Sequence, residues 1–278
     1  MMRSGYWHDL TTTDFAGLDP ERTVALLPVS ATEQHGPHLP LSTDAVINEA
    51  VVRGALAQVP ATAVLLVLPP VPVGDSLEHT AFRGTLSARL ESLLGLWLDI
   101  GAGVARAGVR KLVVFNTHGG QQAHVDLVAV RLRAAHRMLV VRANSSRLGK
   151  PPGLFDADEL AHGLHGGQLE TSLMLHLRPD LVRRAELRDF ASLGGRLAAR
   201  GGQFGVERAV GFGWMSQDVN DEGVCGNAAA ASAELGEALL QFLSARLAAL
   251  VAEVADVPLS ILVDGPLDRA AQAGPEGG

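Results

Sequence analysis

Four short apolar segments alternate along this chain with longer segments of helical spacing, and this alternation is the strongest constraint on its fold. The apolar segments are Thr23–Val29, Ala63–Leu68, Lys111–Phe115 and Met138–Val141. Strands that alternate with helices in this way are typical of an α/β protein with a mostly parallel sheet and helices on both faces. Such a sheet binds ligands at the carboxyl ends of its strands, so we expect a functional site in the loops that follow them.

The remaining regular segments are predicted to be helices. In one of them Leu90, Leu93, Leu94 and Trp97 recur at the three- and four-residue intervals of an amphipathic helix. The predicted helices span Ala45–Gln58, Arg89–Ala107, Gln121–His136, Gln168–Leu177 and Ala228–Val254.

The 278 residues contain no internal repeat and no long linker, which favours a single domain. We predict that this domain spans residues 1–264 and that residues 265–278 form a disordered tail. Residues 1–22 are expected to be a polar lead-in that docks Trp7 and Phe15 on the fold. The glycine-rich residues 191–226 are expected to be irregular.

The composition argues against several classes of protein. A single cysteine, Cys225, excludes an internal disulfide and a CxxC motif. The net charge of −7 comes without a basic segment, which argues against nucleic acid as a partner. Prolines interrupt the longest apolar run, residues 61–73, and the start of the sequence has no signal-like segment. We therefore expect a cytoplasmic protein that binds neither nucleic acid nor a membrane.

Carboxylates and imidazoles gather in the loops after the predicted strands. Glu33 and His35 would point the same way from an extended segment, and Asp44 follows at a helix start, where a carboxylate is favoured. The candidates are Glu33, His35, His38 and Asp44 after the first strand, Asp75, Glu78 and His79 after the second, Asn116, Thr117 and His118 after the third, and His162, His165 and Glu170 later in the chain.

This mixture of carboxylates and imidazoles suits divalent zinc, manganese or iron. Two ions would require a bridging carboxylate, and Asp44 is well placed to bridge. A two-metal site can polarise a carbonyl group and generate hydroxide near neutral pH. Each residue also has a simpler structural interpretation, because a histidine at a strand end is usually only hydrogen-bonded and Glu170 is an ordinary helix residue. The coincidence of many donors at the strand ends favours the metal site.

Five sequence motifs resemble those of the creatininase family of amidohydrolases. The resemblance extends from about Trp7 to about Leu250. It implies a parallel three-layer αβα sandwich, a binuclear metal centre and a hexameric assembly. The motifs are LLPVSATEQHGPHLPLSTD (26–44), GDSLEHTAFRGTLS (74–87), FNTHGG (115–120), HGGQLETSLML (165–175) and GVCGNAAAASAELGEALL (223–240).

The resemblance also implies roles for single residues. Glu33 and His118 would bind one metal ion, His35 would bind the other, and Asp44 would bridge them. Gly120 stands where creatininase has a metal-binding glutamate, so we expect Glu170 to supply the missing ligand and to take part in catalysis. His165 matches a histidine that transfers protons, and the residues expected to contact substrate are Glu78, His79 and Arg83.

Together these observations predict an amidohydrolase with two divalent ions per chain, Zn²⁺ and/or Mn²⁺ with Fe²⁺ as an alternative. A metal-bridging hydroxide would attack a small-molecule amide, with a cyclic amide, a lactam or a formamide as the expected substrate. Creatinine itself is doubtful, because Ser145 and Ala161 stand about where creatininase closes its pocket with two tryptophans. One alternative is a peptidase, as in the family branch that trims the mycofactocin precursor peptide. Another is a metal-binding homologue without catalysis.

Overall fold

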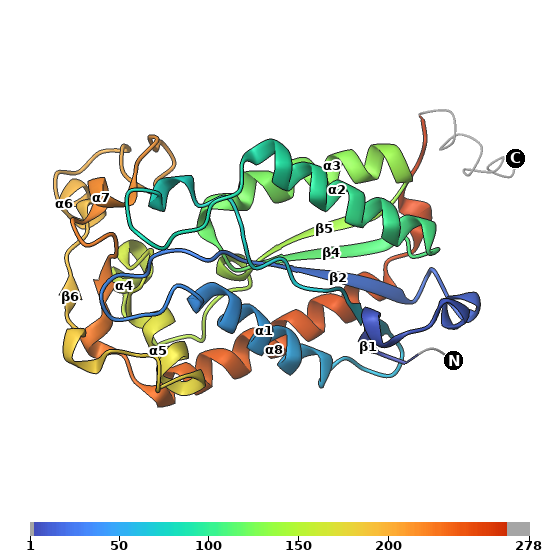
Figure 1. Cartoon of the computed structure of the whole chain (residues 1–278), viewed down its shortest axis with the longest axis horizontal. Helices are drawn as coiled ribbons and strands as arrows, with labels where there is room; N and C mark the ends of the chain where they lie inside the picture. The colour runs from blue at the N-terminus through green and yellow to red at the C-terminus, as the bar shows by residue number, and fades with distance from the viewer. Residues whose placement is uncertain (1–2, 266–278) are drawn as a thin grey trace, which may run out of the picture.

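The computed structural model describes residues 3–265. Its centre is a five-stranded sheet in the order β1–β3–β2–β4–β5, in which every neighbouring pair is parallel (Figure 1). The strands are β1 (Gly5–Tyr6), β2 (Thr23–Val29), β3 (Val64–Val67), β4 (Lys111–Asn116) and β5 (Leu139–Asn144).

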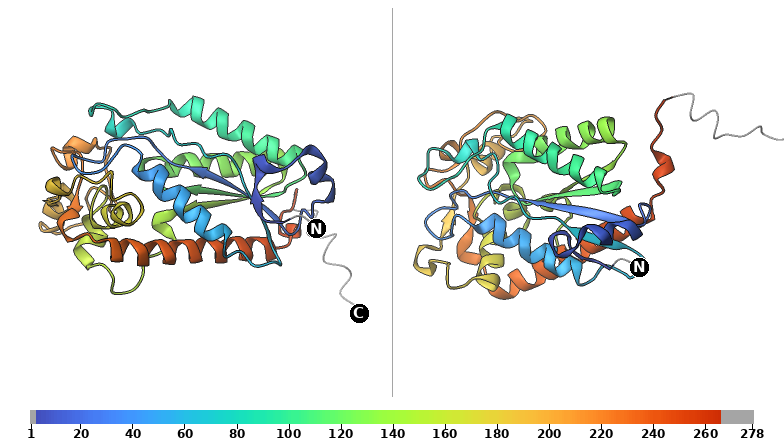
Figure 2. Two further views of the ribbon diagram at one scale, coloured as in Figure 1. Left: turned by 60° about the horizontal axis from the view of Figure 1, so that its bottom comes forward. Right: turned by 45° about the vertical axis from the view of Figure 1, so that its right-hand side comes forward.

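Helices cover both faces of this sheet. The helices α1 (Thr43–Leu56), α5 (Gln168–Leu177) and α8 (Ala233–Asp256) pack on one face, and α2 (Leu90–Arg106) and α3 (Gln122–His136) pack on the other. The two further views show the sheet edge between these layers (Figure 2). The predicted α/β class and the three-layer αβα sandwich are therefore confirmed.

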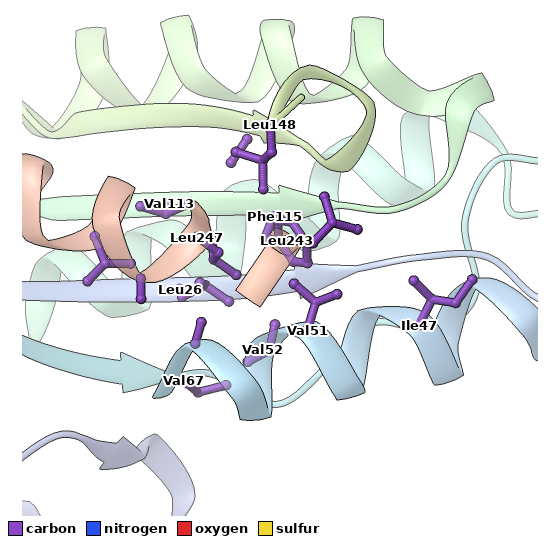
Figure 3. Close-up of a cluster of buried hydrophobic side chains, with 14 of the residues drawn as sticks. Leu26, Ile47, Val51, Val52, Val67, Val113, Phe115, Leu148, Leu243 and Leu247 are labelled. Carbon is purple, nitrogen blue, oxygen red and sulfur yellow. The ribbon is translucent and has the colours of Figure 1, made fainter. Parts of the chain in front are cut away.

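Alternation along β2 explains why the strand is apolar throughout. Val24 and Leu26 join the core beneath α1 and α8, whereas Ala25 and Leu27 join the core beneath α2 and α3. Both faces of the strand are buried, so neither set of alternate residues can be polar. In the first of these two cores, the labelled side chains include Leu26, Val51, Phe115, Leu243 and Leu247 (Figure 3).

The carboxyl ends of the strands open toward a region of short elements (Figure 1). It contains α4 (Ala157–His162), α6 (Leu193–Ala198), α7 (Ser216–Val219) and the antiparallel pair β6 (Asp189–Phe190) and β7 (Gly226–Asn227). The expectation that residues 191–226 are irregular is thus only partly right, since α6 and α7 lie within them. Ser192 favours α6 there by accepting a hydrogen bond from the backbone N–H of Gly194 at 2.9 Å.

The two largest boundary differences from the sequence-based expectation lie at the end of β5 and at the start of α8. β5 continues to Asn144, three residues beyond its predicted end, because it pairs with β4 as far as Asn116. α8 begins at Ala233, because residues 228–230 form a separate turn and the Ser232 hydroxyl then accepts a hydrogen bond from the N–H of Leu235.

The polar lead-in docks through Trp7, which packs against the core beneath α2 and α3, and Phe15 contacts Trp7 with ring centroids 4.7 Å apart. It also contains β1, which is too short for its pattern to indicate a strand. Residues 266–278, which make up most of the predicted tail, lie outside the described residues. The predicted domain boundary therefore stays a prediction.

By length and composition alone, α8 could span a membrane, since an 18-residue window has a mean hydropathy of 1.6. Its buried residues instead pack against the sheet together with those of α1 and α5. They include Leu239, Leu243, Leu247 and Val251. An apolar core helix has the same composition, so the pattern does not indicate a membrane span.

Lys111 connects two chain segments at the end of the fold that lies opposite the short elements. Its buried ammonium group donates hydrogen bonds to the carbonyl oxygens of Glu21 at 2.5 Å, Ala255 at 2.9 Å and Val257 at 2.6 Å. Burial lowers the pKa of this lysine. One side chain at the start of β4 thereby joins the segment before β2 to the carboxyl end of α8.

Replacing Lys111 with methionine is expected to lower the free energy of unfolding by about 2–4 kcal/mol. The reason is that three backbone carbonyls, of which that of Ala255 takes part in a buried hydrogen bond, lose a charged donor. Chemical denaturation followed by circular dichroism measures the difference. Arg147→Met, at an exposed position, is the matched control and should change stability by less than about 0.5 kcal/mol. An equal effect of both substitutions would contradict this role of Lys111.

Candidate metal centre

The predicted donors reach one point at the carboxyl end of the sheet from four separate segments. Glu33 and His35 lie in the loop after β2, Asp44 lies in the first turn of α1, and His118 follows β4. The fourth segment runs into the start of α5 and carries His165. The loop after β2 turns back at Gly36, where φ is +70° and a side chain would be strained. This turn returns the chain alongside Glu33 and His35, so that α1 begins close to them.

The Asp44 carboxylate lies between two imidazoles. Its Oδ1 atom is 3.5 Å from Nε2 of His35, and its Oδ2 atom is 3.6 Å from Nδ1 of His118. Glu33 approaches the same His118 nitrogen with its Oε1 atom at 3.1 Å. A carboxylate that presents one oxygen to each of two histidines has the arrangement required of a bridging ligand.

Several polar atoms at this point are buried and have no hydrogen-bond partner among the described residues. They are Oε2 of Glu33, Nε2 of His35 and Oδ2 of Asp44. Donor atoms of these three residues lie within 4.8 Å of one another. Leaving such atoms unpaired in a protein interior is costly, and a divalent ion would satisfy all of them. The residues present therefore fit a metal centre.

Backbone carbonyls fix the orientation of three imidazoles. Nδ1–H of His35 donates to the carbonyl of Glu33 at 3.1 Å, and Nε2–H of His118 donates to the carbonyl of Asp75 at 2.9 Å. In the same way, Nε2–H of His165 donates to the carbonyl of Gln34 at 2.7 Å. When each ring is neutral, its other nitrogen carries a lone pair directed at the carboxylates. This is the tautomer that a neutral histidine needs to bind a metal ion.

His79 differs from these three rings, because its protonated nitrogen faces the carboxylates. The Gln34 amide nitrogen donates to the Gly223 carbonyl at 2.6 Å, while its oxygen accepts from the N–H of Gly36 at 2.9 Å. With the amide oriented in this way, its nitrogen also donates to Nδ1 of His79 at 2.8 Å. The proton of a neutral His79 ring is therefore on Nε2, 3.6 Å from Oε1 of Glu33. Although His79 lies within reach of a metal site, it is arranged to donate a proton rather than a lone pair.

Two more carboxylates approach the cluster. Oε2 of Glu170 lies 3.8 Å from Nε2 of His35 and accepts a hydrogen bond from the N–H of Gly166 at 2.6 Å. Oε1 of Glu78 lies 3.5 Å from Nε2 of His118 and occupies the space that a side chain at position 120 would need. A side chain at position 120 would therefore displace the Glu78 carboxylate. The sequence-predicted residues Glu78, His79, His165 and Glu170 all lie at the cluster.

Burial and mutual charge perturb the acids and histidines strongly. Burial and the neighbouring Glu33 raise the pKa of Asp44 to about 6. Burial opposes protonation of His35, but the hydrogen bond and charge of Asp44 outweigh it and raise the pKa of His35 to about 9. Burial and the nearby His35 hold the pKa of His165 well below its usual range. His165 is consequently neutral beside a strongly charged cluster.

Other candidates from the strand-end loops lie elsewhere. His38 is buried, has Nε2 2.9 Å from the Gly166 carbonyl and stacks on Phe190. His162 lies 3.9 Å from Asp158 on α4. The Asp75 side chain pairs with His124 at 3.0 Å, away from the metal-binding groups.

Arg83 and the two polar residues after β4 also have other positions. Arg83 is exposed and does not line the pocket described below, so its role in substrate binding stays a prediction. Asn116 supports the metal-binding loop, because its side chain accepts from the N–H of His118 at 3.0 Å and donates to its carbonyl at 2.7 Å. Thr117 donates to the carbonyl of Asp44 at 3.1 Å.

A pocket of about 570 Å³ opens in front of the cluster. Its wall contains residues that sequence reasoning did not select, because most of them are apolar and they lie far apart in the chain. Lys150 could have been noticed in the sequence by its rarity, because this chain has only two lysines. The added wall residues include Lys150, Glu159, Leu160, Leu164, Leu169, Leu173, Glu207, Trp214, Leu239 and Leu243.

The curated proteins similar to this chain include a peptidase and an amidohydrolase. The mycofactocin precursor peptide peptidase of Mycobacterium ulcerans is 36% identical over 162 residues, which cover 56% of this chain and 59% of that protein. The creatinine amidohydrolase of Pseudomonas putida is 32% identical over 199 residues, which cover 66% of this chain and 75% of that protein. The match therefore spans less than two thirds of the length of the peptidase.

Similar solved structures are creatininases. A tryptophan-to-alanine mutant of creatininase has a TM-score of 0.71 at 26% identity, covering 92% of this chain and 100% of that one. A Zn–Zn form of another creatininase mutant has a TM-score of 0.70 at 28% identity, with 91% and 98% covered. A manganese form has a TM-score of 0.69 at 26% identity, with 90% and 98% covered.

The family match agrees with these similarities in sequence and in structure. The family model for creatininase, described as creatinine amidohydrolase, covers residues 8–251. That range includes β2 to β5 and all the residues of the cluster described above. The chain belongs to the creatininase family.

Proposed function

We propose that this chain is a hydrolase that uses two divalent metal ions to cleave the C–N bond of an amide. The observation that carries the proposal is the Asp44 carboxylate, whose two oxygens face the nitrogens of His35 and His118. Ions held there would polarise an amide carbonyl and lower the pKa of water. The residues that would hold them are Glu33, His35, Asp44, His118 and Glu170.

Zinc or manganese is the proposed metal, with Fe²⁺ as an alternative. The donor set of carboxylates and imidazoles supports this choice, because it suits borderline divalent ions. The Zn–Zn and Mn forms among the similar structures give it further support.

His165 and His79 have different proposed roles around the reacting amide. His165 offers a lone pair at Nδ1, so it takes a proton there and returns it to the leaving nitrogen. His79 points Nε2–H toward Glu33 from 3.6 Å and stabilises the charge of that carboxylate electrostatically. Each histidine thus acts through the nitrogen that its backbone or amide partner leaves available.

The bond proposed for cleavage is a non-peptide amide, such as a cyclic amide, a lactam or a formamide. A peptide bond is the second candidate. It is favoured by the 36% identity to the mycofactocin precursor peptide peptidase. The pocket of about 570 Å³ is also large enough for a ligand well above the size of one small ring.

Metal analysis of the purified, desalted protein, followed by a substrate panel, tests the proposal. We expect about two zinc, manganese or iron ions per chain. The metal-loaded protein should hydrolyse members of a panel of lactams, formamides, acyclic amides and short peptides. Hydrolysis confined to the peptides would select the second candidate. Failure to bind more than one ion after incubation with each metal would refute the two-metal proposal.

Glu170→Gln is expected to lower occupancy of one metal site while the other stays filled. The amide keeps the size of the side chain but replaces the negative oxygen near His35 with a weak ligand. Elemental analysis after dialysis against a weak chelator gives the metal content per chain. Glu207→Gln changes the same charge on the pocket wall outside the cluster and is the matched control. Equal metal content in both variants would remove Glu170 from the ligand set.

A further inference from the structure

Lys150 is the one lysine or arginine among the residues that line the pocket. The titratable neighbours on the same wall are acids or histidines, including Glu78, Glu159 and Glu207. No hydrogen bond or ion pair of Lys150 is found within residues 3–265. Burial lowers the pKa of its ammonium group, and the charge of Glu170 opposes that shift. A half-buried cation without a close partner thus lies on the Glu170 side of the pocket.

The acids of the pocket do not neutralise this ammonium group directly. Glu170 lies more than 4.0 Å from it, since no ion pair joins them, and already accepts the N–H of Gly166. Both oxygens of Glu159 accept backbone N–H groups, from Gln168 at 2.6 Å and from Asn227 at 2.8 Å. The charge of Lys150 is therefore available to a bound ligand.

The backbone around Lys150 is held firmly. Gly149 has a φ of +90°, and two prolines, Pro151 and Pro152, restrict the chain on the other side. The preceding carbonyl, that of Leu148, accepts a hydrogen bond from Arg246 on α8 at 3.2 Å. The Lys150 side chain consequently reaches the pocket from a restrained backbone.

We propose that Lys150 forms a subsite for a carboxylate of the substrate, so that the cleaved amide belongs to an N-acyl amino acid or to the end of a peptide. This inference rests on the proposed hydrolase function. A single ammonium group matches the single charge of a carboxylate, whereas a phosphate is usually bound by several cations. The apolar wall supplies space for an apolar side chain on the same amino acid. Its members include Leu160, Leu164, Leu169, Leu173, Trp214, Leu239 and Leu243.

Calorimetric titration of the metal-loaded protein with a matched pair of ligands tests the subsite. The pair is N-acetyl-leucine and N-acetyl-leucinamide, which differ only in carboxylate against carboxamide. The wild type should bind the acid about 10-fold to 100-fold more tightly than the amide. Lys150→Met should bind both ligands alike, and Lys150→Arg should keep most of the preference. Metal content and melting temperature should be unchanged in Lys150→Met.

Two results would overturn the subsite. One is a wild type that binds acid and amide equally, and the other is a preference for the acid that survives in Lys150→Met. The second result would assign the carboxylate to the metal ions. The tripeptide alanyl-alanyl-leucine distinguishes a peptide end from an N-acyl amino acid as the substrate. Tighter binding of the tripeptide than of N-acetyl-leucine would indicate a peptide end, and weaker binding would indicate an N-acyl amino acid. A protein that prefers acids but hydrolyses no amide would support the subsite and refute the proposed function. A protein that hydrolyses amides without preferring acids would support the proposed function and refute the subsite.

Discussion

Asp44→Asn is expected to abolish hydrolysis and to lower metal affinity by at least about 100-fold. Loss of a mere hydrogen-bond partner of a metal ligand commonly costs about 10–100-fold in affinity, and Asp44 is proposed to contact both ions directly. The substitution keeps the shape of the side chain but leaves one weakly coordinating oxygen between His35 and His118. Metal titration of the dialysed protein measures the affinity of each site.

Asp75→Asn is the control for this experiment. It makes the same chemical change at the same edge of the sheet, but the Asp75 side chain pairs with His124 instead of the cluster. The backbone carbonyl that orients His118 is retained in this variant. We expect near-normal metal binding. If Asp44→Asn bound metal as tightly as Asp75→Asn, a bridging role for Asp44 would be excluded.

His165→Ala is expected to retain its metal ions and to lose about 10²–10⁴-fold in kcat. The proposed ligands all remain, but the lone pair that accepts and returns the proton is removed. Metal content and kcat, measured on an amide that the wild type hydrolyses, separate the two effects. A variant that lost both metal and activity would make His165 a ligand, which its position near His35 and Glu170 also permits.

His162→Ala provides the matched comparison for His165→Ala. It removes an imidazole three residues earlier, from a side chain that lies beside Asp158 and outside the cluster. Its kcat should stay within about threefold of the wild type, as expected for a residue that does not touch the reacting groups. Similar losses in both variants would point to disturbance of the segment before α5 instead of proton transfer.

The sequence was most informative where hydrophobic pattern and topology act together. The alternation of apolar segments and helices was sufficient to predict the parallel sheet, and the limits of α5 agree with the structure. The loops after β2 and β4 were then predicted to converge, because parallel strands end at one edge. This explains why Glu33, His35, Asp44 and His118 were among the candidates before their geometry was known, and the family resemblance then selected these four.

Other parts of the site depend on contacts that leave no pattern. The carbonyls of Glu33, Gln34 and Asp75 orient three histidines, but every residue carries a carbonyl. The proton position on His79 follows from a glutamine amide held by Gly223, which is 189 residues away from Gln34 in the chain. Such partners are defined only when the whole fold is assembled.

Gly120 illustrates the same limit in a single position. Its lack of a side chain was apparent from the sequence, and the expected compensation was Glu170. The structure brings Glu170 to His35 but also fills the space in front of Gly120 with Glu78 from the loop after β3. A steric relation between two loops cannot be deduced from either loop alone.

The proposed metal donors and most of the pocket wall come from different parts of the chain. The donors lie in short loops beside β2 and β4 and at the start of α1 and α5, whereas much of the wall comes from residues 145–164 and 207–214. Substitutions in those connections can alter which molecule is recognised without displacing a donor. The architecture separates reactivity from recognition, so a lineage built on it can acquire new substrates while conserving its chemistry.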